Sequence, residues 1–328
     1  MARVIRIHAH GGPEVLKIET VPTPEPKAGQ VRLSVRALGL NRAEVLMRTG
    51  RYIESPLLPS GLGLEAAGVI DAVGEGVAGL AVGDAASLIP PVSMAAWPTY
   101  GDQMVFPAAM VVRHPACLGW DEAAALWMAY LTAYGALVEV ARVTAGEAVI
   151  ITAASSSVGL AAIQIARSLG GKPVAVTRTV GKADALKAAG AASVVVSDAP
   201  GFEDRLRLAC DGPARVVFDA VAGTLFEPLT AVMARGGILI EYGGLAKEPT
   251  PFPLGAVLGK SLTLRGYLVH EVVTDPVRLE RAKAFIAAGV EAGALRPMID
   301  RVFGFEQMAE AHRYLEGNAQ IGKVVVKV

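Results

Sequence analysis

The sequence predicts an α/β protein in which a doubly wound parallel sheet is joined to a separate β-rich domain. Two observations predict the sheet: short apolar runs recur along residues 148–244, and helix-compatible segments separate them. A third observation concerns the first third of the chain, where apolar and polar residues begin to alternate and Gly and Pro mark frequent turns. These patterns indicate two domains of different construction.

Composition is typical of an intracellular globular protein. The 328 residues are enough for two domains with sizeable cores, and the formal net charge of +0 gives no indication of a nucleic-acid or membrane partner. Cys117 and Cys210 are the only cysteines, which excludes a disulfide framework and suits a reducing compartment. The N-terminal segment has no apolar signal core, so we expect a cytoplasmic location.

The first strand that the pattern predicts covers residues 31–41, where alternation is clearest. Turn signals occur at residues 26–29 and 82–84. Near the C-terminus, a helix-like stretch around residues 305–315 precedes a strand over residues 322–328. We expect this last strand to return to the first domain.

The apolar run over residues 148–153 predicts a buried strand, and an amphipathic helix follows as far as Leu169. Small residues occupy the first, third and sixth positions of the turn between them, namely Ala154, Ser156 and Gly159. A dinucleotide-binding turn needs small residues there for a tight bend, close approach of a pyrophosphate and close helix packing. The alternative is an ordinary strand-to-helix turn with a serine N-cap.

Four further apolar runs predict the remaining strands of this sheet, at residues 173–176, 193–197, 215–221 and 237–244. Helix-compatible segments lie between them. Alternating strands and helices of these lengths fold as a parallel sheet with helices on both faces.

The residues after the second of these strands indicate which dinucleotide binds. A carboxylate at the end of that strand, about twenty residues beyond the glycine-containing turn, would hold the ribose 2′-hydroxyl of NAD. This chain instead has Arg178, Thr179 and Lys182. A guanidinium and an ammonium suit a 2′-phosphate, so the sequence predicts NADP(H). The alternative is that Arg178 and Lys182 form the solvated start of a helix.

Several segments together resemble the quinone oxidoreductase (zeta-crystallin-like) branch of the medium-chain dehydrogenase/reductase superfamily. They are LGLNRAEVLMRTGRY, LPSGLGLEAAGVIDAVGEGV, AAALWMAYLTAYGAL, AASSSVGLAAIQIA and GNAQIGKVVV, and they follow the family's order along the whole chain. The resemblance implies a GroES-like catalytic domain from residues 1–125 and 268–328, and a Rossmann NADP(H)-binding domain over residues 126–267. It also implies a cleft between them for nicotinamide and substrate.

The resemblance also predicts that no metal is bound. Zinc alcohol dehydrogenases of the superfamily have a cysteine ligand where this chain has Asn41, and a histidine ligand where it has Leu64, just before Glu65. Leu64 cannot ligate a metal, and Asn41 is a poor substitute for a thiolate. The four closely spaced cysteines of the structural zinc lobe are missing as well. We expect Glu65 to have a structural role or to support the residues that touch the ligand, and not to be catalytic.

Without a Lewis acid to ionise an alcohol, reduction is better supported than alcohol oxidation. NADPH would supply hydride, while the protein aligns an electrophile, supports developing oxygen charge and admits a proton. The sequence therefore predicts NADPH-dependent reduction of a small-molecule quinone. Two alternatives stay open: an alkene reductase acting on α,β-unsaturated carbonyl compounds, and a non-catalytic NADPH-binding protein.

The resemblance gives roles to three residues near the reacting groups. Asn41 and Tyr52 would face nicotinamide and substrate, with Tyr52 donating a hydrogen bond to the substrate oxygen and water as the other proton source. Alternatively, the Tyr52 hydroxyl tethers its loop. Asn41 would position cofactor or substrate through its amide. Thr132 would meet the nicotinamide, or bond its own helix backbone instead.

Further cofactor-binding residues follow from the same resemblance. The set predicted to contact the pyrophosphate is Ser156, Ser157, Val158 and Gly159. The set predicted to border the nicotinamide end is Tyr242, Gly243 and Gly244. Thr179 and Lys182 match positions near the 2′-phosphate. Lys323 would reach the cofactor, unless it is a strand-edge charge that resists aggregation.

Family members often pair the exposed edge of the nucleotide-binding sheet across a two-fold axis. Residues 261–267 have the composition of such an edge strand. We therefore expect a homodimer.

Overall fold

The computed structural model describes residues 1–328 and divides them into two units. Unit 1 comprises Met1–Met128 and Arg296–Val328, and unit 2 comprises Ala129–Leu295. The chain therefore passes from unit 1 to unit 2 inside helix α3 (Trp127–Tyr134). The sequence placed residues 268–295 in the GroES-like domain, whereas they lie in unit 2.

A six-stranded sheet forms the centre of unit 2, with the strand order β11-β10-β9-β12-β13-β14 and every neighbouring pair parallel. The order reverses between β9 and β12, as in a doubly wound fold. The strands are β9 (Ala148–Ile151), β10 (Lys172–Thr177), β11 (Ser193–Val196), β12 (Ala214–Asp219), β13 (Met233–Glu241) and β14 (Thr263–Gly266). All five predicted strands and the predicted edge strand are confirmed, although β13 begins earlier than its apolar run.

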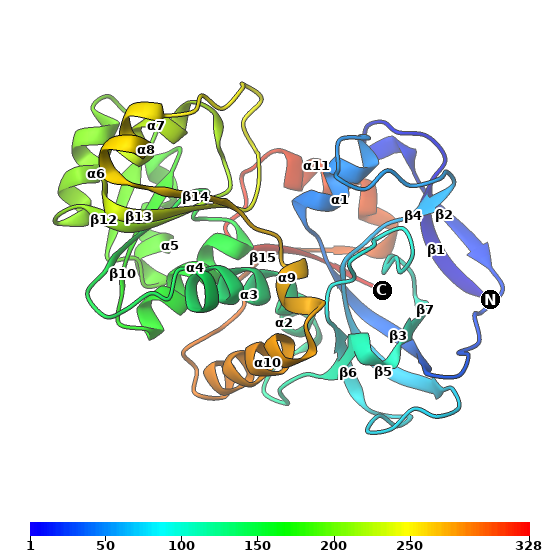
Figure 1. The fold of residues 1–328 in the computed structure, drawn as a ribbon. Coiled ribbons are helices and arrows are strands. Elements are labelled where there is room, and N and C mark those ends of the chain that lie inside the picture. Colours follow the sequence, from blue (N-terminus) through cyan, green and yellow to red (C-terminus); the bar gives the residue numbers. More distant parts are fainter. The chain divides into compact units, whose positions relative to one another are not determined.

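Helices cover both faces of this sheet. Figure 1 shows α3 and α4 on one face and α7 and α8 on the other. Apolar side chains such as Leu206 and Leu229 fill the space between the sheet and the helices. The helices are α4 (Ser157–Ser168), α5 (Ala183–Ala188), α6 (Phe202–Cys210), α7 (Phe226–Ala231) and α8 (Leu254–Lys260), and a π-helix (Gly135–Val140) continues α3.

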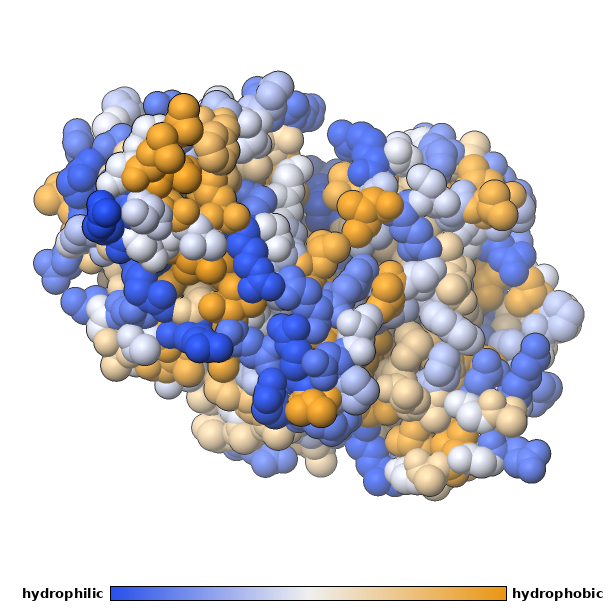
Figure 2. Space-filling view, viewed as in Figure 1, coloured by the Kyte–Doolittle hydropathy of each residue, from blue (hydrophilic) through white to orange (hydrophobic).

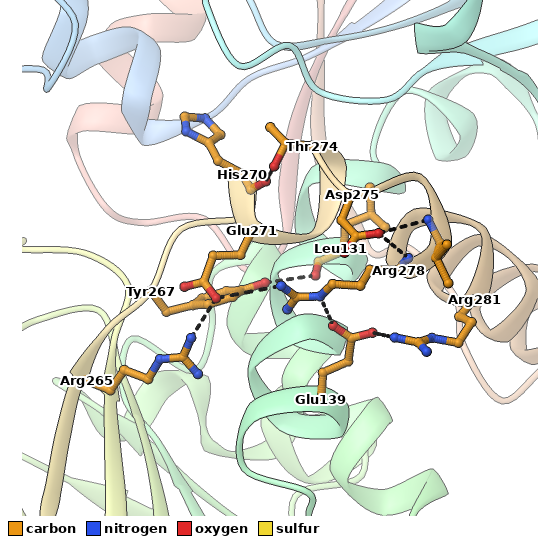
Figure 3. Close-up of polar contacts among 11 residues, drawn as sticks. Leu131, Glu139, Arg265, Tyr267, His270, Glu271, Thr274, Asp275, Arg278 and Arg281 are labelled. Carbon is orange, nitrogen blue, oxygen red and sulfur yellow. Dashed lines mark hydrogen bonds and ion pairs between the residues drawn. The ribbon is translucent and has the colours of Figure 1, made fainter.

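Ion pairs explain why residues 268–295 belong to unit 2 (Figure 3). Glu139, in the π-helix, accepts from Arg278 Nε at 2.6 Å and from Arg281 Nη2 at 3.1 Å. Its side chain is only 12% exposed, which strengthens these interactions. Glu271 accepts from Arg265 Nη2 of β14 at 2.6 Å. Helix α9 (His270–Val273) is thereby attached to β14, and α10 (Pro276–Glu291) to the π-helix.

Unit 1 is built from two mainly antiparallel sheets. The larger has the order β15-β16-β3-β5-β6-β8, with β7 also paired to β3, and the smaller has the order β2-β1-β4. The strands are β1 (Ala2–Ile7), β2 (Leu16–Val21), β3 (Gln30–Gly39), β4 (Ser60–Gly61), β5 (Glu65–Val73), β6 (Ala85–Leu88), β7 (Gln103–Pro107), β8 (Val111–Arg113), β15 (Ile299–Gly304) and β16 (Lys323–Lys327). The helices are α1 (Arg42–Arg48), α2 (Trp120–Ala123) and α11 (Met308–Glu316).

The C-terminal strand returns to the first domain, as the sequence predicted. Strand β16 pairs antiparallel with β3, so that Val325 lies opposite Gly39, and pairs parallel with β15. The two ends of the chain thus share one core, which includes Leu33, Phe106 and Val324. None of the helices combines the length and the apolar character needed to cross a bilayer.

Candidate functional site

Three polar side chains meet in the interior of unit 1. Asn41 follows β3, while Glu65 begins β5 and Lys323 begins β16. Strand β3 lies between β5 and β16 in the sheet, so the topology brings these residues together. Lys323 Nζ donates to Asn41 Oδ1 at 2.7 Å and forms an ion pair with Glu65, and Asn41 Nδ2 donates to Glu65 Oε2 at 3.1 Å.

Burial makes this cluster a fixed structural unit. The side chains of Lys323 and Glu65 are 1% and 2% exposed. Lys323 is therefore not a strand-edge charge, because its ammonium lies inside unit 1. The Asn41 amide is fully engaged too, since Nδ2 also lies 3.2 Å from Glu44 Oε1 and 3.3 Å from Gly39 O. The second carboxylate oxygen of Glu65 accepts from Met128 N at 3.0 Å.

The residues here do not suit a zinc ion. Leu64 is buried and offers no ligand atom, and the Asn41 carbonyl oxygen already accepts from an ammonium. No group of three or more His, Cys, Asp or Glu side chains is placed to hold a metal. A divalent cation beside Lys323 would also be repelled by the ammonium, whose charge is already paired with Glu65.

A second buried network begins at Glu44, the third residue of α1. Its carboxylate accepts from the backbone N–H of Asn41, which forms a capping box, and from Leu64 N at 3.1 Å. Tyr100 OH donates to Glu44 Oε2 at 3.0 Å and lies 3.1 Å from His312 Nε2. Because the Tyr100 proton is committed to Glu44, its oxygen accepts from Nε2–H of His312. Sequence reasoning missed this network, although the Asn-x-x-Glu spacing was a visible signal.

Burial sets the protonation of this network. It raises the pKa of Glu44 to about 7, against the opposing effect of the Asn41 N–H and the Lys323 charge. It lowers the pKa of His312 to about 3, and the cations Arg48 and Arg42 add to that effect. His312 is therefore neutral at physiological pH.

Tyr52 is half-buried in unit 1. Its ring packs against the hydrophobic core, while its hydroxyl makes no hydrogen bond. The loop is tethered by another residue: Glu54 accepts from Ser93 Oγ at 2.5 Å and from Met94 N at 3.0 Å. Burial raises the pKa of Tyr52, with further contributions from Glu44 and Glu54, so the phenol keeps its proton.

In unit 2, the turn after β9 requires glycine where the sequence predicted it. A Cβ on Gly159 would lie 2.6 Å from the carbonyl oxygen of Ala154 and 2.7 Å from that of Ala153. Helix α4 therefore passes directly against the turn. Ser156 is the N-cap, and its Oγ accepts from Gly159 N at 3.0 Å. Ser157 and Val158 begin the first turn of α4. The backbone N–H groups of a first turn have no carbonyl partner within the helix.

The predicted 2′-phosphate residues lie next to this turn. Because β9 and β10 are adjacent and parallel, the segments that follow them meet at one edge of the sheet. Lys182 Nζ donates to Ser155 Oγ at 3.1 Å. Arg178 and Thr179 follow the end of β10 and are exposed, which leaves the guanidinium accessible. The structure thus brings a guanidinium, an ammonium and a helix N-terminus to one face of unit 2.

The remaining predicted residues follow β13 or lie in α3. Tyr242 stacks on Phe218 of β12, with ring centroids 4.0 Å apart. A Cβ on Gly243 would lie 3.1 Å from the carbonyl oxygen of Ala220, so the chain runs close to β12, whereas Gly244 has open space beside it. Thr132 is buried in α3.

A doubly wound sheet whose first turn requires glycine at a helix N-terminus, in a chain that also has a β-rich unit, is typical of nucleotide-dependent oxidoreductases. Two family models match the chain, one described as alcohol dehydrogenase GroES-like domain over residues 27–153 and one as zinc-binding dehydrogenase over residues 189–326. The human quinone oxidoreductase is 30% identical over 330 residues, which cover 99% of this chain and 98% of that protein.

Solved structures agree with this relationship. The Escherichia coli quinone oxidoreductase complexed with NADPH has a TM-score of 0.91 and 27% identity, with 100% of both chains covered. An NAD-dependent alcohol dehydrogenase has a TM-score of 0.88 and 31% identity, with 99% of both chains covered. The chain belongs to the quinone oxidoreductase branch of the medium-chain dehydrogenase/reductase superfamily.

Replacing Gly159 by Ala should damage the turn. The added Cβ would overlap the Ala154 carbonyl oxygen, so α4 must shift, and we expect a loss of about 1–3 kcal/mol in the free energy of unfolding. NADPH affinity should fall at least about tenfold, because the predicted pyrophosphate-binding turn would be displaced. Urea unfolding and fluorescence titration measure the two effects. Gly255→Ala in α8 is the matched control, since its Cβ meets open space; equal behaviour of the two variants would contradict the role of Gly159.

Glu44 should make the stability of unit 1 depend on pH. Its pKa is raised when the protein folds, so its contribution is complete below about pH 4.5 and is lost as the pH rises through about 7. The free energy of unfolding should fall by about 1–3 kcal/mol across this range in the wild type and much less in Glu44→Gln. Urea unfolding at several pH values measures this. Glu75→Gln, which removes an exposed carboxylate, should follow the wild type; an identical profile for Glu44→Gln would show that Glu44 does not titrate there.

Proposed function

We propose that this protein is a zinc-independent, NADPH-dependent oxidoreductase that reduces quinones by hydride transfer. The observation that carries the proposal is the buried ammonium of Lys323, which contacts Asn41 and Glu65. The resemblance implies that Asn41 occupies the position of the cysteine that ligates zinc in the alcohol dehydrogenases of this superfamily. A lysine that already neutralises Glu65 leaves no requirement for a metal cation there.

The cofactor-binding residues are those that the turn and the strand ends of unit 2 bring together. The N-terminus of α4, with Ser156, Ser157, Val158 and Gly159, would hold the pyrophosphate. Arg178, Thr179 and Lys182 would hold the 2′-phosphate, since a guanidinium and an ammonium neutralise a phosphate dianion. Tyr242, Gly243 and Gly244 would border the nicotinamide, with Thr132 as a further contact. When bound, NADPH supplies the hydride.

Tyr52 is the residue that we propose to act on the substrate. Its phenol is protonated and free of internal hydrogen bonds, so it can donate to a substrate oxygen as negative charge develops. A quinone that accepts a hydride takes up one proton to become a hydroquinone, and water or the Tyr52 phenol delivers it. Asn41 holds the loop before α1 in place through its bonds to Glu44 and Glu65.

The test is NADPH and NADH oxidation with 1,4-benzoquinone, 9,10-phenanthrenequinone and an enone, each with and without a chelator. We expect chelator-insensitive turnover of quinones with NADPH preferred. Arg178→Ala should lose most of that preference, because it removes a charge that binds only the 2′-phosphate. Tyr52→Phe should lower kcat by roughly tenfold to a hundredfold, as a lost hydrogen bond to developing charge implies.

Each alternative has its own signature in this assay. Chelator-sensitive turnover would contradict zinc independence. Faster turnover of the enone than of either quinone would indicate an alkene reductase. Tight NADPH binding without turnover of any acceptor would indicate a non-catalytic NADPH-binding protein. An unchanged coenzyme ratio in Arg178→Ala would contradict the role of Arg178.

We also propose that the protein is a homodimer assembled through the β14 edge. Strand β14 has a neighbour on one side only, so its other edge offers unpaired backbone groups. Figure 2 shows hydrophobic side chains gathered over the region of α7 and α8 in unit 2. Among them, Phe252, Leu254 and Leu258 are 64%, 57% and 70% exposed. Apolar residues this exposed are typical of a surface that a partner covers.

Charge on this surface should therefore separate the subunits. Leu254→Asp combined with Leu258→Asp buries two carboxylates at the proposed interface, and we expect a monomer in light scattering after size exclusion. Leu208→Asp is the matched control, because Leu208 is 81% exposed on α6, which packs beside β11 at the opposite edge of the sheet. A dimer that survives the double substitution, or a monomeric wild type, would contradict the proposed interface.

A further inference from the structure

Two carboxyl groups lie side by side at one edge of the unit 2 sheet. Asp219 ends β12 and Glu241 ends β13, and the two residues are partners in the strand register. Asp219 is fully buried and accepts from Val221 N and Ala222 N, each at 2.9 Å, and from Thr152 Oγ1. These three donors satisfy Asp219 in its anionic form.

Glu241 has no comparable set of donors. Both of its carboxyl oxygens are buried, and neither accepts a hydrogen bond within normal geometry. An ionised carboxylate in that position would lie unsolvated beside the anionic Asp219, which is costly, whereas a protonated one can donate to Asp219. These surroundings therefore favour a protonated Glu241 beside Asp219.

The surroundings of Glu241 contain no cation that would stabilise its ionised form. The groups that act on it are Asp219 of β12, the N–H of Gly243, and Tyr242 of its own strand, whose phenol is buried and neutral. Burial, with Asp219 second, raises the pKa of Glu241 to about 9, and the Gly243 N–H opposes the rise. One proton thus separates two charge states of the pair within reach of physiological pH.

The position of the pair connects it with the cofactor. In open α/β sheets, ligands bind beyond the carboxyl ends of the strands at the point where the strand order reverses, which here is between β9 and β12. Asp219 ends β12 at that point, and Tyr242, Gly243 and Gly244 directly follow Glu241. These three residues are the ones that we propose to border the nicotinamide. The nicotinamide ring is neutral in NADPH and carries a positive charge in NADP⁺.

We propose that the Asp219–Glu241 pair makes the affinity for the cofactor depend on its redox state, because NADP⁺ binds best when Glu241 has released its proton. This inference rests on the proposed function. Binding of the cationic ring expels one proton from Glu241 to solvent and moves no electrons. NADPH has no ring charge, so its binding leaves the proton in place. At neutral pH the retained proton weakens the hold on NADP⁺, which favours release of the oxidised product.

The experiment is isothermal titration calorimetry of NADP⁺ and NADPH between pH 6.5 and pH 9.5. At each pH, two buffers with different ionisation enthalpies report the number of protons released. NADP⁺ and NADPH carry the same pyrophosphate and the same 2′-phosphate. Titration of these groups therefore changes both affinities equally and does not change their ratio. The variants are Glu241→Gln and, as a matched control, Glu227→Gln, which removes an exposed carboxylate of α7.

In the wild type and in Glu227→Gln, the ratio of NADP⁺ affinity to NADPH affinity should rise by at least about fivefold from about pH 6.5 to about pH 9.5. This is the usual size of the coupling between two binding events, which here are the binding of NADP⁺ and of a proton. Proton release should accompany NADP⁺ binding only. In Glu241→Gln the ratio should be independent of pH, and NADP⁺ should bind without releasing that proton.

A pH-independent ratio in the wild type, or an unchanged slope in Glu241→Gln, would overturn the inference. The wild-type proton count decides the question even if Glu241→Gln does not fold. Failure of the wild type to bind either cofactor would contradict the proposed function instead, so the two failures are distinguishable.

Discussion

The arrangement of unit 1 depends on one buried ion pair, between Lys323 and Glu65. Its two partners come from opposite ends of the chain, and Asn41, which bonds to both, is 282 residues away from Lys323 in sequence. A buried charge is strongly unfavourable alone, so each partner requires the other. This requirement fixes the register of β16 on β3 and closes the sheet on both termini.

Buried carboxyl groups have different surroundings in the two units. In unit 1, Glu65 is neutralised by Lys323, while Glu44 is surrounded by N–H and O–H donors. In unit 2, Asp219 accepts from three donors, whereas the Glu241 oxygens accept no hydrogen bond of normal geometry and have no cation beside them. The first arrangement gives a rigid support for the loop that carries Tyr52. The second leaves a proton that can be exchanged, at the end of the sheet where a charged ring would bind.

The features that the sequence predicts correctly are local. An apolar run forms a strand because of its own side chains, and Gly159 is required by the turn that contains it. Contacts between distant residues were not predictable in the same way. Residues 268–295 join unit 2 because Arg278 pairs with Glu139, which is 139 positions away. Lys323 has the sequence context of a strand-edge lysine, and only the pairing of β16 with β3 places it in the interior. Similarly, nothing in the sequence shows that Glu54, and not Tyr52, tethers the loop.

The most direct measurement is a double-mutant cycle on Lys323→Met and Glu65→Gln, with the free energy of unfolding obtained from urea titration. If the structure depends on this ion pair, Lys323→Met alone should cost about 3–5 kcal/mol, because it leaves Glu65 charged and buried without a partner. Adding Glu65→Gln should recover a large part of that loss, and Lys327→Met, an exposed lysine on the same strand, should cost little. Losses that simply add, with no recovery in the double variant, would show that the ammonium and the carboxylate do not stabilise each other.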